Sequence, residues 1–375
     1  MNNYRKLLRV AFLGGSSNSA VGRAHVTALR LLPYFHLVGG LFSRNEVENK
    51  KTLYDFNLPL SPTLKSIDDF IGWVSKEQID LVVLLTPTDQ HFTHLLLLSN
   101  LGIPVISEKA LATSNQQAQE IVDRYKQSNC KNFVMYNYTS YPMVREMRAI
   151  LNNWGKGCLK FVKLEMPQDS FIKVGNDGKF LLPQEWRRKD YAIPTITLDL
   201  GVHLHSLTSF LFEQELEVEG AFVRESSLGK VSGVIDDVSI STFLQSGVPV
   251  DFWYSKVALG YKNGLKISVF GERESLSWLQ ERPDQLLVSD SCGKLTIIRR
   301  GDFGLLEANA ERYSRFKGGH PTGFIEAMSN YYEDIALNLL SLSTESFLSD
   351  RNLFTFQDAQ IGLGFFEKSR LVVRS

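Results

Sequence analysis

Two patterns of apolar and polar positions divide the chain. Up to about residue 135, short uninterrupted apolar runs alternate with segments in which apolar residues recur every three or four positions. Uninterrupted runs indicate strands that are buried on both faces, and the wider spacing indicates helices with one apolar face. The predicted strands are 7–15, 35–43, 79–87, 103–107 and 132–137, and the predicted helices between them are 22–32, 46–56, 66–75, 90–102 and 114–128.

This alternation predicts an α/β domain with a doubly wound parallel sheet. After about residue 150 the strand-like segments follow one another without helices, which predicts an α+β domain with a large, mostly antiparallel sheet whose one face is open. Because 375 residues exceed one ordinary core, we expect two domains, 1–138 and 139–375. The predicted elements of the second domain are strands 159–167, 216–226, 237–246, 248–259, 265–272 and 294–300, hairpin turns in 244–250 and 261–266, and helices 322–340 and 355–370.

The composition excludes several classes of partner. Lys and Arg together number 41, as do Asp and Glu, so the net charge of zero creates no global field that would attract nucleic acid or an anionic membrane. No apolar stretch reaches the ~20 residues that span a bilayer. The three cysteines are scattered and form no CxxC pair, which argues against a disulfide framework or a structural metal site. We therefore expect a cytoplasmic protein without a bound metal.

The segment LGGSSNSAVGRAH, residues 13–25, places three glycines and three serines between a predicted strand and a predicted helix. Glycines let the backbone approach a pyrophosphate that sits at the helix N-terminus, and serine hydroxyls add donors. The spacing is two residues longer than GxGxxG, so the same glycines also fit an ordinary turn of an α/β domain. The residues expected to bind a dinucleotide here are Gly14, Gly15, Ser16, Ala20 and Val21.

The end of the second strand bears on the choice between NAD and NADP. Ser43 and Arg44 stand where NAD enzymes often carry an acid for the ribose hydroxyls. Arg44 could face a 2′-phosphate, which tilts the expectation slightly toward NADP, or stack on adenine. A solvated surface arginine is the remaining interpretation, so NAD and NADP both stay open.

An acid and a histidine interrupt the apolar run LDLGVHLHSL. Asp199 and His203 are four residues apart, so on a helix they would share one face. Such a pair either satisfies itself in a core or handles a proton, since an imidazole with an unperturbed pKa near ~6.5 exchanges protons close to neutral pH. Asp199 could orient His203 and stabilise its charged form.

Three motifs, in order along the chain, carry a resemblance to a known family. LTPTDQH resembles its TPNxxH segment, ISEKAL its EKP motif, and LDLGVHLHSL its DxGxH motif. With similar segments at 136–148, 263–278 and 318–327, the sequence resembles the Gfo/Idh/MocA oxidoreductases over nearly its whole length. The resemblance implies an N-terminal Rossmann domain and an NAD- or NADP-dependent reaction on a sugar, sugar derivative or cyclitol.

The resemblance also implies roles for individual residues. Lys109 matches the lysine beside the nicotinamide and the reacting hydroxyl, and Asp199 and His203 match the acid and histidine of the catalytic motif. Whether Lys109 or His203 is the base stays open. The resemblance places further residues near the cofactor, in addition to Ser43 and Arg44 at the end of the second strand. They are Thr86, Pro87, Thr88, His91, Glu108, Asn137, Trp186 and Arg187.

Two departures from the family pattern affect these expectations. EKP becomes Glu108-Lys109-Ala110, so a cis bond before Ala110 would lack its proline, and a trans bond would shift Lys109. Residues 193–197, IPTIT, are bulky and stiff where the family is often glycine-rich, which could reshape the cleft.

The leading expectation is a dehydrogenase or reductase with a small polyol or sugar substrate, assembled as a homodimer or homotetramer through the open sheet face. A different class, a non-catalytic sensor that binds a dinucleotide, is the alternative. Within the enzyme class, glycoside hydrolysis through a transient 3-keto sugar is a further option. The presence of Lys109, Asp199 and His203 together argues against the sensor, which needs no such set.

Overall fold

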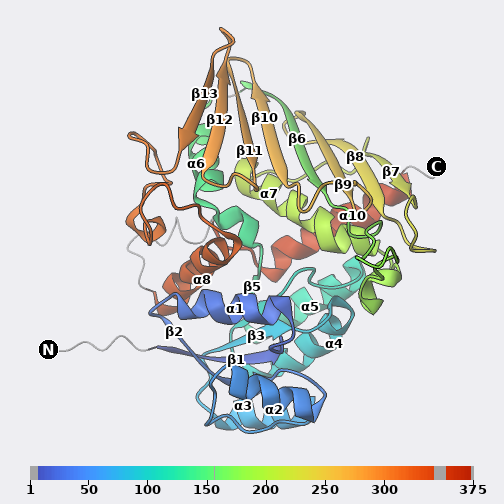
Figure 1. Cartoon of the computed structure of the whole chain (residues 1–375), viewed down its shortest axis with the longest axis vertical. Coiled ribbons are helices and arrows are strands. Elements are labelled where there is room, and N and C mark those ends of the chain that lie inside the picture. Colours follow the sequence, from blue (N-terminus) through green and yellow to red (C-terminus); the bar gives the residue numbers. More distant parts are fainter. Residues whose placement is uncertain (1–6, 156, 342–351, 373–375) are drawn as a thin grey trace, which may run out of the picture. The chain divides into compact units, whose positions relative to one another are not determined.

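The computed structural model describes residues 7–155, 157–341 and 352–372, and Figure 1 shows its elements. The chain forms two compact units. The first contains the chain up to Asn137 together with Phe324–Gln360, and the second contains Tyr138–Gly323 and the chain from Ile361 onward. The boundary expected between residues 138 and 139 stays a prediction about folding domains. The compact units differ from these expected domains, because the segment Phe324–Gln360 belongs to the first unit.

A five-stranded parallel sheet forms the centre of the first unit, in the order β2-β1-β3-β4-β5. All pairs are parallel, which confirms the predicted doubly wound Rossmann sheet. The central strand β3 is buried along its whole length, as its uninterrupted apolar sequence predicts. The strands are β1 (Leu8–Gly14), β2 (Phe35–Leu41), β3 (Leu81–Leu85), β4 (Val105–Ser107) and β5 (Asn132–Val134).

The helices of this sheet begin at residues with capping side chains. Ser114, the first residue of a predicted helix, is its N-cap and accepts a hydrogen bond from the backbone N–H of Gln117, and Ser66 forms a capping box with Asp69. In Figure 1, α1 lies on one side of the sheet and α2 and α3 lie on the other. The helices are α1 (Ala20–Arg30), α2 (Glu46–Asp55), α3 (Ile67–Lys76), α4 (Thr88–Leu98) and α5 (Asn115–Ser128), with the short turn η1 (Ser99–Leu101).

A helix from the end of the chain completes the first unit. Helix α8 (Phe324–Leu340) packs against α1, and Ser329 Oγ donates to the carbonyl oxygen of Ala28 at 3.1 Å. Tyr331 Oη donates to the carbonyl oxygen of Val134 at 2.7 Å, which ties α8 to β5. The N-terminal sheet therefore depends on residues almost two hundred positions away.

The second unit contains an eight-stranded sheet in the order β13-β12-β11-β10-β6-β9-β8-β7. Its neighbouring strands are antiparallel except for the parallel pair β6–β9, so the predicted mostly antiparallel sheet is confirmed. Helices α6 (Pro142–Asn152) and α7 (Val202–Phe212) lie along one face (Figure 1). The strands are β6 (Leu159–Pro167), β7 (Phe222–Ser226), β8 (Asp237–Phe243), β9 (Pro249–Ser255), β10 (Lys266–Gly271), β11 (Glu274–Leu279), β12 (Gln285–Asp290) and β13 (Leu295–Arg299).

One of the two predicted hairpins is wrong. The turn in 244–250 joins the paired strands β8 and β9. The Asn-Gly turn in 261–266 joins β9 to β10, which do not pair because β6 lies between them. Asn263 instead donates to Tyr138 Oη at 3.1 Å and accepts from Gln168 at 2.8 Å, and Gly264 N–H donates to the carbonyl oxygen of Pro167. Strands β11 and β12, absent from the predicted elements, lie between β10 and the edge strand β13.

The last helix, α10 (Phe356–Val372), runs from the first unit into the second. Among the described residues, no helix is both long enough and apolar enough to span a bilayer. The described residues also contain no group of three or more His, Cys, Asp or Glu side chains that could hold a metal ion.

Candidate active site

The glycine-rich loop between β1 and α1 requires glycine at three positions. Gly14 and Gly15 have φ values of +90° and +77°, a region that side chains rarely adopt. A Cβ atom on Gly22 would lie 2.1 Å from the carbonyl oxygen of Gly15. The first turn of α1 therefore packs directly on the loop, and a side chain at any of the three glycines would collide with its neighbours.

Helix α1 begins immediately after this loop. Ser19 caps the helix by accepting from the N–H of Gly22, and no acidic residue occupies its first turn. Ala20 and Val21 are the first two helical residues, and both are exposed. Backbone N–H groups of a first turn carry partial positive charge and have no partners within the helix. The sequence and the loop geometry together fit the pyrophosphate of a dinucleotide.

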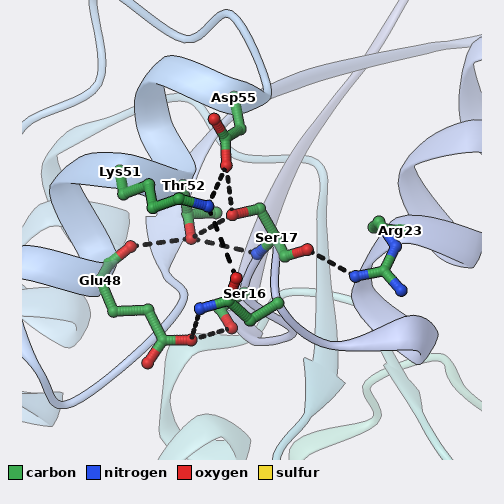
Figure 2. Close-up of polar contacts among 8 residues, drawn as sticks. Ser16, Ser17, Arg23, Glu48, Lys51, Thr52 and Asp55 are labelled. Carbon is green, nitrogen blue, oxygen red and sulfur yellow. Dashed lines mark hydrogen bonds and ion pairs between the residues drawn. The ribbon is translucent and has the colours of Figure 1, made fainter.

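The two serines of the loop face α2. Ser16 Oγ donates to Glu48 at 2.5 Å, and Ser17 Oγ donates to Asp55 at 2.6 Å (Figure 2). Lys51 pairs with Asp55 at 2.9 Å along the same helix. These contacts fix the loop to α2, so the serine hydroxyls act first as anchors of the loop.

Ser43 and Arg44, at the end of β2, lie in different surroundings. Ser43 Oγ donates to Glu48 at 3.2 Å, whereas Arg44 is exposed. Burial, the neighbouring His91 and the charge of Arg44 together lower the pKa of His94 to about 4. Arg44 therefore lies within electrostatic reach of α4.

The segment after β3 carries the predicted cofactor wall, Thr86 to His91. Pro87 precedes the first residue of α4, Thr88, and is exposed. The two ring nitrogens of His91 lie 2.8 Å from the carbonyl oxygens of Thr86 and Ala110. Burial lowers the pKa of His91 below its ordinary value. His91 thus braces this wall against the segment that carries Lys109, a structural contribution to the site.

Lys109 follows β4 and is held through its neighbours. The peptide bond between Lys109 and Ala110 is cis, which is the first of the two expected alternatives. Glu108 Oε2 accepts from the N–H of Lys109 at 3.2 Å, and Glu108 Oε1 lies 2.8 Å from His25 Nε2. His25 Nδ1 lies 2.5 Å from Tyr332 Oη, and both rings are fully buried. A series of side-chain contacts therefore runs from Tyr332 of α8 through His25 of α1 to Glu108, and Glu108 positions the backbone of Lys109.

In the second unit, Asp199 lies in a wide π-helical turn, η4 (Thr197–Gly201), immediately before α7. Its Oδ2 atom lies 2.5 Å from Lys256 Nζ and 3.3 Å from Arg187 Nη2. Lys256 Nζ also donates to Gln168 Oε1 at 3.0 Å, and the lysine is buried. Asp199 is therefore a buried carboxylate between two cations.

His203 lies in the first turn of α7 and is buried. Its ring meets Tyr138 edge-on, with centroids 4.6 Å apart. His205, two residues on, packs against Phe365 and Phe366 of α10, and burial lowers its pKa to about 4. Of the two histidines of this segment, His205 belongs to the neutral core.

The remaining predicted residues lie in both units. Arg187 of the short turn η3 (Glu185–Arg188) stacks on Trp186, with its guanidinium 4.7 Å from the ring centroid. Asn137, the last residue of the first unit, is buried. The bulky residues 193, 195, 196 and 197 are buried as well. Asp199 and Arg187 thus come together, while Lys109 belongs to the first unit and His203 to the second.

Sequence reasoning missed several residues around the predicted ones, namely His25, Glu48, Gln168, Lys256 and Tyr332. Lys256 had a usable signal, because it follows the apolar strand segment VDFWYS at a position that ordinarily favours an uncharged side chain. His25 follows the glycine loop within an apolar helix pattern, which is a weaker indication. No local pattern pointed to Gln168 or Tyr332.

A Rossmann sheet with a glycine loop, followed by a large open sheet bearing a buried acid–histidine segment, defines a two-part NAD-binding oxidoreductase. The chain belongs to the Gfo/Idh/MocA family. A family profile described as "Oxidoreductase family, NAD-binding Rossmann fold" matches residues 8–138, and one described as "GFO/IDH/MocA C-terminal domain" matches residues 144–277. The resemblance seen in the motifs is thereby confirmed.

Similar proteins are oxidoreductases. The chain is 25% identical over 340 residues to the uncharacterized oxidoreductase YfiI of Bacillus subtilis, covering 88% of this chain and 85% of that protein. It is 22% identical to glucose-6-phosphate 3-dehydrogenase of Bacillus subtilis, covering 70% and 73%. Its fold is similar to that of an inositol dehydrogenase homolog from Azotobacter vinelandii complexed with NADH and myo-inositol, with a TM-score of 0.85, 21% identity and coverage of 99% and 96%.

Proposed function

We propose that this protein is a dehydrogenase or reductase that moves a hydride between NAD or NADP and a CH–OH carbon of a sugar, sugar derivative or cyclitol. The observation that carries the proposal is the buried carboxylate of Asp199, which two cations hold one turn before His203 in a chain of the NAD-binding family. The named activities and ligand of the similar proteins, glucose-6-phosphate 3-dehydrogenase and a homolog bound to myo-inositol, support the substrate class.

The residues of the first unit fit a dinucleotide. The glycine-rich loop with Gly14, Gly15 and Gly22 and the first turn of α1 would hold the pyrophosphate. The segment from Thr86 to His91 would form a wall of the site. When bound, the nicotinamide ring supplies the hydride chemistry, and the protein supplies position and electrostatic field.

Within the reaction, the protein must also move a proton. Oxidation of an alcohol releases a proton from its hydroxyl, and Lys109 or His203 would take it. Asp199, kept between Lys256 and Arg187, would hold the electrostatic field around this step constant. His91 and Glu108 would fix the loop that carries Lys109, because each contacts the backbone of the segment 109–110.

The test is a panel of sugars, sugar phosphates and cyclitols offered with NAD and with NADP, followed by the absorbance of the reduced nicotinamide. Turnover of at least one polyol supports the proposal. Binding of a dinucleotide without turnover across the panel favours the sensor instead. Cleavage of a glycoside together with formation of a 3-keto product would favour glycoside hydrolysis through a 3-keto sugar over simple dehydrogenation.

We further propose a homodimer or homotetramer formed through the outer face of the eight-stranded sheet. Phe161 and Phe270 stack there with centroids 5.8 Å apart, and Phe270, Phe243 and Phe222 are exposed by 42%, 39% and 61%. Light scattering at micromolar protein concentration measures the molar mass and so tests this assembly. The molar mass of a monomer would contradict it. The cytoplasmic location expected from the cysteines also stays a prediction, which cell fractionation would check.

A further inference from the structure

The end of β2 has no acid, but a carboxylate reaches it from α2. Glu48 Oε1 accepts from Ser16 Oγ of the glycine loop at 2.5 Å, and Glu48 Oε2 accepts from Ser43 Oγ at 3.2 Å. Glu48 therefore bridges the loop after β1 and the end of β2. Figure 2 shows its contact with Ser16 of the loop. In dinucleotide-binding units these two segments flank the ribose of the adenosine half, and an acid there accepts from the 2′-hydroxyl.

The contacts of Glu48 favour its charged form. The hydrogen bond from Ser16 is the largest influence on the pKa of Glu48 and lowers it; burial opposes this, and smaller contributions from Ser43, Asn18 and the charge of Lys51 add to the lowering, so the net pKa is below its ordinary value. The carboxylate accepts from the hydroxyls of Ser16 and Ser43 and from the amide of Asn18, all of which are uncharged donors. A carboxylate has about four acceptor sites, and the donors from Ser16, Asn18 and Ser43 use three of them, which leaves capacity for a ribose hydroxyl.

The nearby cations of α1 and α2 are directed elsewhere. Lys51 Nζ pairs with Asp55 at 2.9 Å, and Arg23 donates to the carbonyl oxygen of Ser17 at 2.7 Å (Figure 2). A phosphate placed beside Glu48 would therefore meet like charge. This repulsion lowers affinity about tenfold or more. Two unit charges 4 Å apart interact by about 1 kcal/mol even in water, a 2′-phosphate carries nearly two charges, and 1.4 kcal/mol is tenfold.

We propose that Glu48 makes the protein selective for NAD over NADP, by accepting from the ribose 2′-hydroxyl and repelling a 2′-phosphate. The proposal rests on the dinucleotide site of the proposed function. Glu48 would take the place of the acid that is missing at Ser43. It lies five residues later, in α2. Arg44, the basis of the slight expectation of NADP, is the competing determinant.

The experiment measures binding rather than turnover. Calorimetric titration of the full chain with NADH and NADPH gives the ratio of the two dissociation constants, and ADP-ribose with its 2′-phosphorylated form repeats it without the nicotinamide. We expect the wild type to bind NADH at least about tenfold more tightly. Glu48→Gln, which keeps the size and one acceptor, should lower this ratio about tenfold.

Glu46→Gln is the matched control. Glu46 lies on the same helix, loses the same charge and pairs with Lys50 and Lys65 outside the network. It should leave the ratio unchanged. A wild type that prefers NADPH, or a ratio that Glu48→Gln leaves unchanged, overturns the inference while dinucleotide binding still supports the proposed function. A folded protein that binds neither dinucleotide overturns both.

Discussion

Nζ of Lys256 lies 2.5 Å from Oδ2 of Asp199, and both side chains are buried. The lysine follows β9 and the aspartate lies in the π-helical turn before α7, so the ion pair joins the sheet to the segment that carries His203. Taking both charges out of water is costly, and Gln168 and Arg187 supply the extra contacts that such a pair needs. The position of Asp199 therefore depends on a residue outside its own helix.

Replacing Lys256 with methionine should destabilise the second unit and lower activity together. Breaking a buried pair by removing one partner leaves Asp199 charged with less compensation, which costs about 3–5 kcal/mol. Urea denaturation and kcat are the measurements. Lys163→Met is the matched control, because Lys163 pairs with Glu165 on the outer face and is 41% exposed. That control should change stability by less than about 1 kcal/mol, and equal losses in both variants would contradict the assignment.

Lys109→Met and His203→Ala should each lower kcat far more than they weaken cofactor binding. If either side chain does acid–base work, the expected loss in kcat is ~2–4 orders of magnitude. Steady-state kinetics and NADH titration of each variant separate the two effects. Lys76→Met, an exposed residue at the end of α3, controls for loss of a lysine. Full rates in both variants would show that the site is misassigned.

The fold was predictable where burial dictates sequence. Strand β3 is buried at every position, as its short uninterrupted apolar run between turn residues predicted. The hairpin prediction for 261–266 failed because an Asn-Gly pair specifies a turn but not which strands it joins, and β6 inserts between β9 and β10. Local sequence carries no information about such long-range insertion.

The candidate site was predictable only where its residues stand in local motifs. Lys109, Asp199 and His203 lie in short segments with recognisable spacing. Their supports come from distant positions, as Lys256 is 57 residues from Asp199 and Tyr332 is 307 residues from His25. Such pairs form through packing of separate elements, so no periodicity in the sequence indicates them.

Gly22→Ala should damage the dinucleotide site, and Gly72→Ala should not. A Cβ on Gly22 would lie 2.1 Å from the carbonyl oxygen of Gly15, so the loop must move, with an expected cost of about 1–3 kcal/mol. We expect at least tenfold weaker NADH binding, measured by titration. Gly72 lies inside α3 with no atom within 4 Å of its Cβ position, and alanine there should raise stability by up to about 1 kcal/mol. Unchanged binding in Gly22→Ala would remove the loop from the site.

Stability should fall as the solution is acidified, because buried histidines resist protonation. Burial lowers the pKa of His205 from 6.5 to about 4. Above pH 6.5 both the folded and unfolded chains hold this histidine neutral. Between about pH 6.5 and 4 only the unfolded chain gains the proton, so His205 lowers the free energy of unfolding by up to about 1.4 kcal/mol per pH unit.

His205→Gln should remove this part of the pH dependence in the second unit, whatever its effect at pH 7. His94, whose pKa is also lowered to about 4, makes the corresponding contribution in the first unit, so His94→Gln should act there. Urea denaturation at pH 7, 6 and 5, with probes assigned to each unit, measures both slopes. If His205→Gln lost stability on acidification as steeply as the wild type, the histidine would not be the group that resists the proton, and other groups would have to supply the slope.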